Sequence, residues 1–320
     1  MIRGGSSLPY FLKPTNPATF FGCVFEPAFW ATGHTGTDYA LSFKNCKSGI
    51  LHPPLLTTCI PRVRFFQCAI GCTDRRYAIH IGTSGWTYSD WKHSFYPPTI
   101  PTSRWFQYYA QQFETVEINA TFYRKFPLST FLKWRTQAPP GFRYVLKAPR
   151  IITHRKYLVE VEKDIEEFMK LASLLEDTLG LILLQLAPST PYDPPLLERA
   201  LIAFPDPSRV AVEVRHPRWI TEETKQMLAN LGSVFCDSDS PKQRPLGWVT
   251  THTAYLRLHG RSKWYAHRYT HEELLEILSW IRGSMRAGAR EIYVFFNNDF
   301  QAFAPSNALE LKGMIGEAFG

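Results

Sequence analysis

The chain has 320 residues, of which 45% are hydrophobic, and its 36 Lys and Arg against 28 Asp and Glu give a formal net charge of +8. Its longest apolar stretch, residues 179–186, is far too short to cross a bilayer, so no membrane partner is expected. Residues 1–76 hold eight basic and three acidic residues, which leaves +3 on the rest. The basic balance therefore gives little support for nucleic-acid binding by residues 77–320.

Residues 1–76 show no sustained period of 2 or 3.6 and are interrupted by turn-forming segments such as Leu51-His52-Pro53-Pro54. We interpret them as an irregular or disordered N-terminal extension. A tail, a segment upstream of a mis-set start and an organelle-targeting segment stay open as explanations. Five of the six cysteines lie here, but Cys59, Cys68 and Cys72 do not match a paired zinc-binding pattern. Reduced thiols in the cytoplasm are the favoured interpretation.

From residue 77 onward, short apolar runs alternate with helical patterns. Eight runs are expected to be strands, and nearly every one ends in a polar or charged side chain: 79–82, 115–119, 142–147, 181–186, 210–215, 233–237, 254–259 and 291–297. This pattern predicts an α/β fold, a (β/α)8 TIM barrel, with reactive groups at the carboxyl ends of the strands.

Helices are expected between these strands, at about 104–112, 129–134, 161–179, 195–203, 221–231, 271–286 and 305–314. In residues 238–253, Pro241, Pro245 and Gly247 favour a loop. The helix of the sixth repeat is therefore expected to be missing or reduced.

Strand alternation predicts which polar side chains face the barrel interior. For example, Val116 and Ile118 suit the helix side, which turns Glu117 inward. The same count turns inward a set of polar residues: Glu117, Asn119, Lys147, Gln185, Glu213, Arg215, Asp237, Tyr255, Arg257 and His259. Buried charges must pair, meet water or meet a ligand. An internal ion-pair network explains any one residue as well as a functional role does, but for the whole set a ligand pocket is favoured.

Aromatic, basic and amide side chains follow several strands and are candidates for ligand contacts. They are Trp86, Tyr88, Tyr123, Arg124, His154 and Asn298. Aromatic rings among Arg and Lys suit a planar or anionic ligand. The Gly82-Thr83-Ser84-Gly85 segment is not a dinucleotide fingerprint, because it lacks the third glycine.

Several of these motifs resemble one known family. The segment Gly82-Thr83-Ser84-Gly85-Trp86-Thr87-Tyr88, the stretch 113–123 and Glu213-Val214-Arg215-His216 with Trp219 are similar to DUF72, the YecE-like (UPF0759-type) proteins of unknown function. The resemblance covers about residues 77–320 and implies a TIM barrel. It implies no particular activity. Likeness of that fold to endonuclease IV and sugar-isomerase barrels is an analogy for nucleic-acid or metal chemistry.

The leading hypothesis is an enzyme, hydrolase or isomerase, that acts by acid–base chemistry on a phosphorylated or nucleotide-like ligand in an anion-binding pocket. Glu117 or Glu213 would be the general acid or base, with a pKa raised toward neutrality by burial. His154 or His259 would shuttle a proton. The remaining candidates are Asp237 for catalysis and Trp86, Tyr88, Asn119, Tyr123, Arg124, Lys147, Gln185, Arg215, Arg257 and Asn298 for ligand binding.

Two alternatives are left open. No cofactor is certain, but Glu117, Glu213, Asp237, His216 and His259 could ligate a divalent metal, against which stand the cations interleaved with them. A non-catalytic nucleic-acid binder would use the basic aromatic residues Arg261, Lys263, Trp264, Tyr265, His267, Arg268 and Tyr269. A scaffold without activity explains the inward charges poorly.

Overall fold

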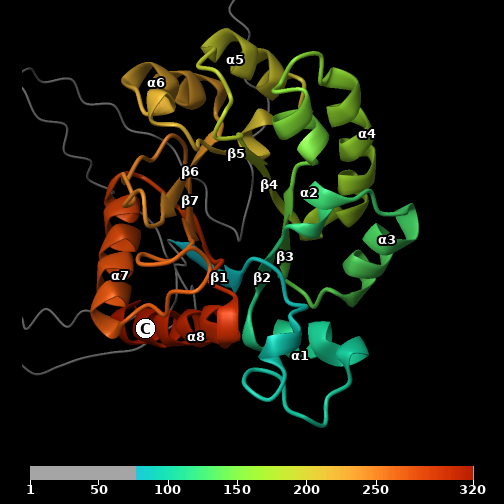
Figure 1. The fold of residues 1–320 in the computed structure, drawn as a ribbon, viewed down its shortest axis with the longest axis vertical. Helices are drawn as coiled ribbons and strands as arrows, with labels where there is room; N and C mark the ends of the chain where they lie inside the picture. Colours follow the sequence, from blue (N-terminus) through green and yellow to red (C-terminus); the bar gives the residue numbers. More distant parts are fainter. Residues whose placement is uncertain (1–76, 320) are drawn as a thin grey trace, which may run out of the picture. The chain divides into compact units, whose positions relative to one another are not determined.

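A computed structural model describes residues 77–319 of the chain (Figure 1). The expectations for residues 1–76, including the extension and its cysteines, lie outside the described residues. Within residues 77–319, no helix is both long and apolar enough to cross a membrane.

Eight parallel strands form one sheet in the order β1-β8-β7-β6-β5-β4-β3-β2. The strands are β1 (Ala78–Thr83), β2 (Thr115–Ile118), β3 (Arg143–Lys147), β4 (Leu179–Gln185), β5 (Val210–Glu213), β6 (Val234–Asp239), β7 (Thr253–Leu258) and β8 (Glu291–Phe296). Helices surround the strands in Figure 1. The expected TIM barrel is confirmed, with each expected strand found within a few residues of its place.

The helices are α1 (Trp105–Gln112), α2 (Ala120–Tyr123), α3 (Leu128–Gln137), α4 (Glu162–Ala172), α5 (Pro194–Ile202), α6 (Glu222–Leu231), α7 (His271–Arg286) and α8 (Phe303–Phe319). The one-turn helix α2, directly after β2, was not expected. The expected helix 161–179 instead stops at Ala172 and continues as a 3-10 segment, in which Glu176 has a φ of 47°. No helix lies between β6 and β7, which confirms the expectation that the helix of the sixth repeat, after β6, is missing.

Strand alternation sorts the barrel interior into two zones. An apolar cluster fills its amino-terminal part: Val145, Leu181, Leu183, Ala211, Val234, Cys236, Tyr255, Tyr293 and Phe295. Two residues further along several of these strands, the side chains become polar, as at Lys147, Gln185 and Arg257. The apolar zone therefore acts as a floor beneath the carboxyl ends of the strands.

β1 and β2 stand at the two ends of the strand order, and the barrel closes between them by contacts other than a backbone ladder. Gly82 of β1 lies so close to β2 that a Cβ there would collide with the carbonyl oxygen of Thr115. The buried hydroxyl of Tyr109, on α1, accepts a hydrogen bond from the Thr83 N–H at 2.9 Å and donates one to the Thr115 carbonyl at 3.0 Å. A tyrosine hydroxyl thus joins the two strands where a backbone ladder joins the others.

Replacing Tyr109 by Phe should lower the free energy of unfolding by about 1–3 kcal/mol, because a buried N–H and a buried carbonyl each lose a partner. Urea unfolding followed by circular dichroism measures this loss. The control is Tyr108→Phe on the same helix, since the Tyr108 hydroxyl makes no hydrogen bond within residues 77–319. Equal losses in the two variants would contradict a bridging role for Tyr109.

Candidate functional site

A buried arginine lies at the centre of the polar zone. Arg257, on β7, donates to Glu117 through Nε at 2.9 Å and Nη2 at 2.7 Å, and to Glu213 through Nη1 at 2.7 Å. All three side chains are at most 1% exposed. One guanidinium therefore bridges carboxylates from β2 and β5, and its pair with Glu117 has the bidentate geometry that makes Arg–carboxylate pairs strong.

Both carboxylates are also saturated by other donors. Glu117 accepts hydrogen bonds from the hydroxyls of Ser84 at 2.7 Å and Tyr255 at 2.6 Å. Glu213 accepts from the Gln185 amide at 2.6 Å and pairs with Arg215 at 2.8 Å. Buried ion pairs are tolerated when every lone pair is satisfied in this way.

These contacts contradict the expected raised pKa of the two glutamates. Burial by itself raises the pKa of Glu117, but the charge and hydrogen bonds of Arg257 outweigh it, and the net effect lowers the pKa. Burial also raises the pKa of Glu213, yet Arg215 and Arg257 bring it well below its ordinary value. Both groups stay ionised at neutral pH, so they are poorly suited to act there as a general acid or base.

His259 continues the network instead of facing solvent. It is fully buried, with Nε2 3.0 Å from Glu213 and Nδ1 2.9 Å from the side-chain amide of Asn297. Nε2 also lies 3.0 Å from Nη2 of Arg215, so this nitrogen donates to Glu213 in one tautomer and accepts from Arg215 in the other. Burial lowers the pKa of His259 to about 4, so the ring is neutral near pH 7.

The predicted inward orientation of Asp237 is wrong. Val234 and Cys236 fill the interior on β6, so Asp237 faces outward, where it accepts from the backbone N–H groups of Leu246 at 2.9 Å and Gly247 at 2.7 Å. The physical reason is that no helix follows β6 to cover it. A loop covers this side of β6, and Asp237 supplies the acceptor for its backbone N–H groups at Leu246 and Gly247.

A cavity of about 500 Å³ opens at the carboxyl ends of the strands. It is lined by Tyr88, Asn119, Phe122, Tyr123, Lys147, Arg150, His154, Gln185, Pro188, Arg215, Arg257, Tyr265, Asn297 and Asp299. Eight of the sequence-derived candidates thus line one cavity. Glu117, Glu213 and His259 support it from below without lining it.

The structure places three other candidates away from this cavity. Trp86 packs edge-on against Phe106 and Trp134. Arg124 lies over the ring of Phe126, at 4.5 Å from its centroid. Asn298 is buried and donates to the backbone carbonyl of His267 at 2.8 Å.

The cavity also contains residues that were not among the candidates. Asn297 follows Tyr293 and Phe295 in the alternation of β8, a signal that could have identified it. Arg150 and Asp299 lie on the turns after β3 and β8, where strand alternation has no predictive value.

Lys147 is one of two cations of the cavity, with Arg150, that have no acidic partner within residues 77–319. Its Nζ makes no hydrogen bond or ion pair with residues 77–319 and lies 4.2 Å from the centroid of the Phe122 ring. Helix α2 holds that ring in place, since Thr121 Oγ1 donates to the Lys147 carbonyl at 2.7 Å. Burial, followed by the positive charge of Arg257, lowers the pKa of Lys147 to about 7.

His154 faces the same ring as Lys147. Its imidazole stands edge-on to Phe122 with centroids 4.8 Å apart, and Nδ1 lies 2.8 Å from the Thr153 hydroxyl. Burial and the positive charges of Lys147 and Arg150 lower the pKa of His154 to about 4. A neutral imidazole and a lysine with a pKa near 7 thus contact the same phenyl ring.

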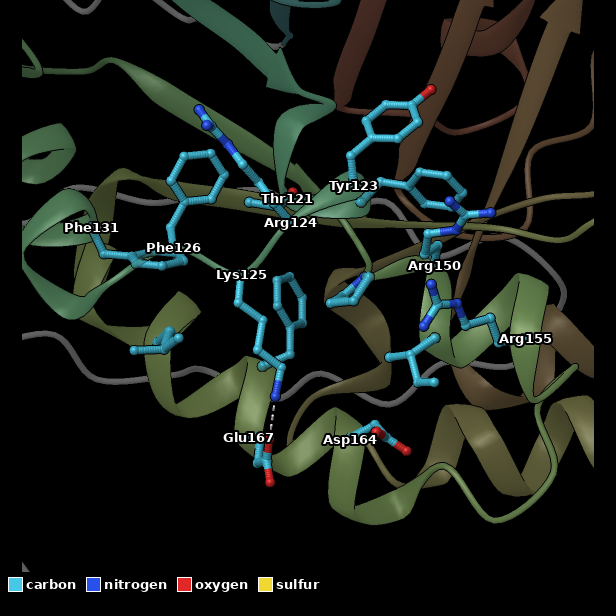
Figure 2. Close-up of a pocket in the computed structure, with 15 residues that line it drawn as sticks. Thr121, Tyr123, Arg124, Lys125, Phe126, Phe131, Arg150, Arg155, Asp164 and Glu167 are labelled. Carbon is cyan, nitrogen blue, oxygen red and sulfur yellow. Dashed lines mark hydrogen bonds and ion pairs between the residues drawn. The ribbon is translucent and has the colours of Figure 1, made fainter.

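A second, smaller cavity of about 220 Å³ lies between α2, α3 and α4 (Figure 2). Its walls are mainly apolar, and Lys125 pairs across it with Glu167 at 2.9 Å. Figure 2 shows Arg124, Arg150 and Arg155 around it. Phe122, Tyr123 and Arg150 line both cavities.

The residues present do not fit the metal hypothesis. Arg257 occupies the space between Glu117 and Glu213, and Asp237 faces the other side of its strand. His216 is exposed and accepts from the Arg218 N–H. Within residues 77–319, no three His, Cys, Asp or Glu side chains are grouped so as to hold a metal ion.

The basic aromatic stretch 261–269 is largely engaged in contacts within the barrel. Arg261 pairs with Asp239 at 2.8 Å and with Glu276 at 2.8 Å. His267 pairs with Glu273 at 2.8 Å, and Tyr269 is buried. Nucleic-acid binding by this stretch stays a prediction.

Comparison with known proteins gives consistent matches. The sequence model of a family described as "Protein of unknown function DUF72" matches residues 80–319. The UPF0759 protein YecE of Escherichia coli is 31% identical over 156 residues, 48% of this chain and 54% of YecE, so the chain spans about half of that relative. The UPF0759 protein YunF of Bacillus subtilis is 25% identical over 273 residues, 74% of this chain and 94% of YunF. A DUF72 family protein from Thermotoga maritima has a crystal structure with a TM-score of 0.70 and 30% identity, covering 75% of this chain and 100% of its own.

Replacing Arg257 by Met should cost about 3–5 kcal/mol of unfolding free energy at pH 7, because buried carboxylates lose their partner. In the wild type the pKa of Glu117 is lowered, so this group stabilises the fold when the pH is above its ordinary pKa of 4.5. This stability is lost as the pH falls through the folded pKa. In the variant, burial dominates and the folded pKa is raised, so stability falls as pH increases from 4.5. The difference in unfolding free energy between wild type and Arg257→Met should therefore be smaller at pH 5 than at pH 7.

Urea unfolding at both pH values measures this difference. Arg124→Met, which removes an exposed guanidinium, is the control and should show little loss at either pH. A loss in Arg257→Met that does not change with pH would contradict the role of Arg257 as counter-ion.

Proposed function

The chain belongs to the DUF72 family, described as proteins of unknown function, and we propose that it is an enzyme acting on a small phosphorylated or nucleotide-like anion. The ligand would occupy the cavity of about 500 Å³ at the carboxyl ends of the strands. That volume lies within the range of about 300–1,000 Å³ usual for small-molecule sites. Active sites of this fold lie at the same face.

The observation that carries the proposal is the unpaired Lys147. The cavity walls present four cationic groups, of which Arg257 and Arg215 are neutralised by the glutamates below them. Lys147 and Arg150 have no acidic partner within residues 77–319. A buried cation without a counter-ion is costly, and an anionic ligand would supply that counter-ion.

The aromatic side chains at the rim suit a planar group. Tyr88, Tyr123 and Tyr265 line the cavity, and Tyr123 is 68% exposed although it is a large hydrophobic residue. Stacking on such rings is the usual way in which proteins bind a base or another flat ring. The same cavity would thus accept an anionic group near Lys147 and a ring near its mouth.

Proton transfer is assigned to Lys147 and His154 instead of the two glutamates. Efficient acid–base catalysis needs a pKa near the working pH, and Lys147, at about 7, meets this condition. His154, with a pKa of about 4, is a neutral relay that can accept and pass on a proton. Hydrolysis and isomerisation both require such a step, so both reaction types remain within the proposal.

Arg150→Met should weaken the binding of sulfate about tenfold, because one charge-assisted contact to the anion is lost. Isothermal titration calorimetry at constant ionic strength measures this change. Arg155→Met is the matched control, since Arg155 lies five residues further along, lines the second cavity and does not line the first. Equal weakening by both variants would point to a diffuse charge effect and contradict a bound anion at Arg150.

Sulfate binding should also weaken as pH rises from 6 to 8.5. Lys147 loses its proton around pH 7, whereas sulfate keeps the same charge throughout this range. In Lys147→Met the affinity should be lower and nearly constant with pH. A wild-type affinity that does not change with pH would remove Lys147 from the anion site.

A further inference from the structure

We propose that Lys147 is a nucleophile that forms an imine with the carbonyl group of a small anionic aldehyde or ketone. The inference rests on the proposed function, because it places the substrate in the same cavity. It adds the chemical class of the substrate and a covalent step. Amine nucleophiles of this kind are activated by desolvation or by a neighbouring cation.

The first support is the contrast between Lys147 and the other buried cation. Arg257 and Lys147 are 1% and 6% exposed, and both line the cavity. Arg257 is held by three hydrogen bonds to two glutamates, whereas the Nζ of Lys147 has no partner within residues 77–319. An amine that served only to balance charge would be expected to contact one of these carboxylates. The free Nζ instead has access to the ligand space.

The second support is the surroundings of the amine. Phe122 packs against Nζ and keeps water from one side, while Arg257 and Arg215 add positive charge nearby. Burial and the two arginines favour the uncharged amine, the charges of Glu213 and Glu117 oppose them, and the net effect lowers the pKa of Lys147 to about 7. A large share of the lysine is therefore nucleophilic at neutral pH, and a protonated share remains to attract the anion.

The reaction balances without an added oxidant or reductant. The Nζ lone pair attacks the carbonyl carbon, and the C=O π electrons move to oxygen. One of the protons on the nitrogen passes to that oxygen through His154, which lies against the same phenyl ring, and a neutral carbinolamine results. A proton from solvent then converts the hydroxyl to water, which leaves while the nitrogen lone pair forms the C=N bond, and the protonated imine can return that proton to solvent. The net change is amine plus carbonyl giving imine plus water.

The imine then explains why proton transfer would follow. When protonated, it withdraws electrons from the adjacent carbon, so that a C–H bond there can release its proton and leave its electron pair in an enamine. Return of a proton to the other face of the same carbon restores the imine, and hydrolysis releases the epimer and the free lysine, which is an isomerase reaction. A peptide or phosphate ester gains nothing from this step, so the inference favours the isomerase over the hydrolase.

Reductive methylation with formaldehyde and cyanoborohydride at pH 7 tests the amine itself, without needing the true substrate. Formaldehyde forms an imine with any accessible uncharged lysine, and the reductant makes it permanent. Peptide mapping by mass spectrometry should show Lys147 modified at least about tenfold faster than the exposed Lys133 and Lys163. Added sulfate should slow only Lys147. A rate for Lys147 equal to or below theirs would overturn the inference.

A second experiment tests recognition of the anionic carbonyl. Wild-type protein is incubated with dihydroxyacetone phosphate or with dihydroxyacetone and then reduced with borohydride. We expect one adduct, on Lys147, formed preferentially from the phosphorylated ketone. Lys147→Met should form none, and Arg150→Met should lose the preference for phosphate while keeping the fast reaction with formaldehyde.

The outcomes separate the two proposals. Sulfate binding that depends on Arg150 and Lys147, with no adduct from either ketone and slow methylation, would sustain the anion site and overturn the imine. Fast methylation without sulfate binding would sustain the nucleophile and overturn the anionic substrate. Adducts spread over surface lysines would count against Lys147.

Discussion

The bridge from Arg257 to Glu117 and Glu213 is the interaction on which the site depends. It joins β7 to β2 and β5 across the barrel, and its further hydrogen bonds reach Ser84 after β1 and Gln185 at the end of β4. Charges so deeply buried are tolerated only when each finds its partner, and removal of one leaves the others uncompensated. This charged network beneath the cavity is therefore held in place, because any loosening would leave an unpaired charge in the buried interior.

The polar residues at this end of the barrel form two groups, which differ in whether their side chains are paired with one another. The glutamates, Arg257 and His259 are saturated by one another, and their protonation states are fixed near neutral pH. Lys147 and His154 lie above them on the turn side of the barrel and keep atoms free toward the cavity. A charged network thus supplies position and electrostatic potential, while Lys147, whose pKa lies near 7, is at its edge with the neutral His154 nearby.

The sequence predicted the arrangement of the barrel well because strand alternation is a local property. Glu117, Glu213 and Arg257 face inward as their apolar neighbours indicated. Asp237 did not, since its direction depends on a loop that replaces a helix, and this is a tertiary property. The pKa of the glutamates was expected in the wrong direction for a similar reason. Burial can be read from a pattern of residues, but the identity of the partner on another strand cannot.

The joint between β1 and β2 has a consequence for how the chain assembles. β1 has its hydrogen-bonded ladder with β8, and its link to β2 runs through the Tyr109 hydroxyl. A chain that emerges amino end first therefore holds β1 without a strand partner until nearly the whole barrel has been synthesised. Such long-range pairing is slow to form, since loop-closure entropy is lost before the contacts are gained. The Tyr109 hydroxyl, which links β1 to β2, can retain β1 during this interval, until β8 has been made and pairs with β1.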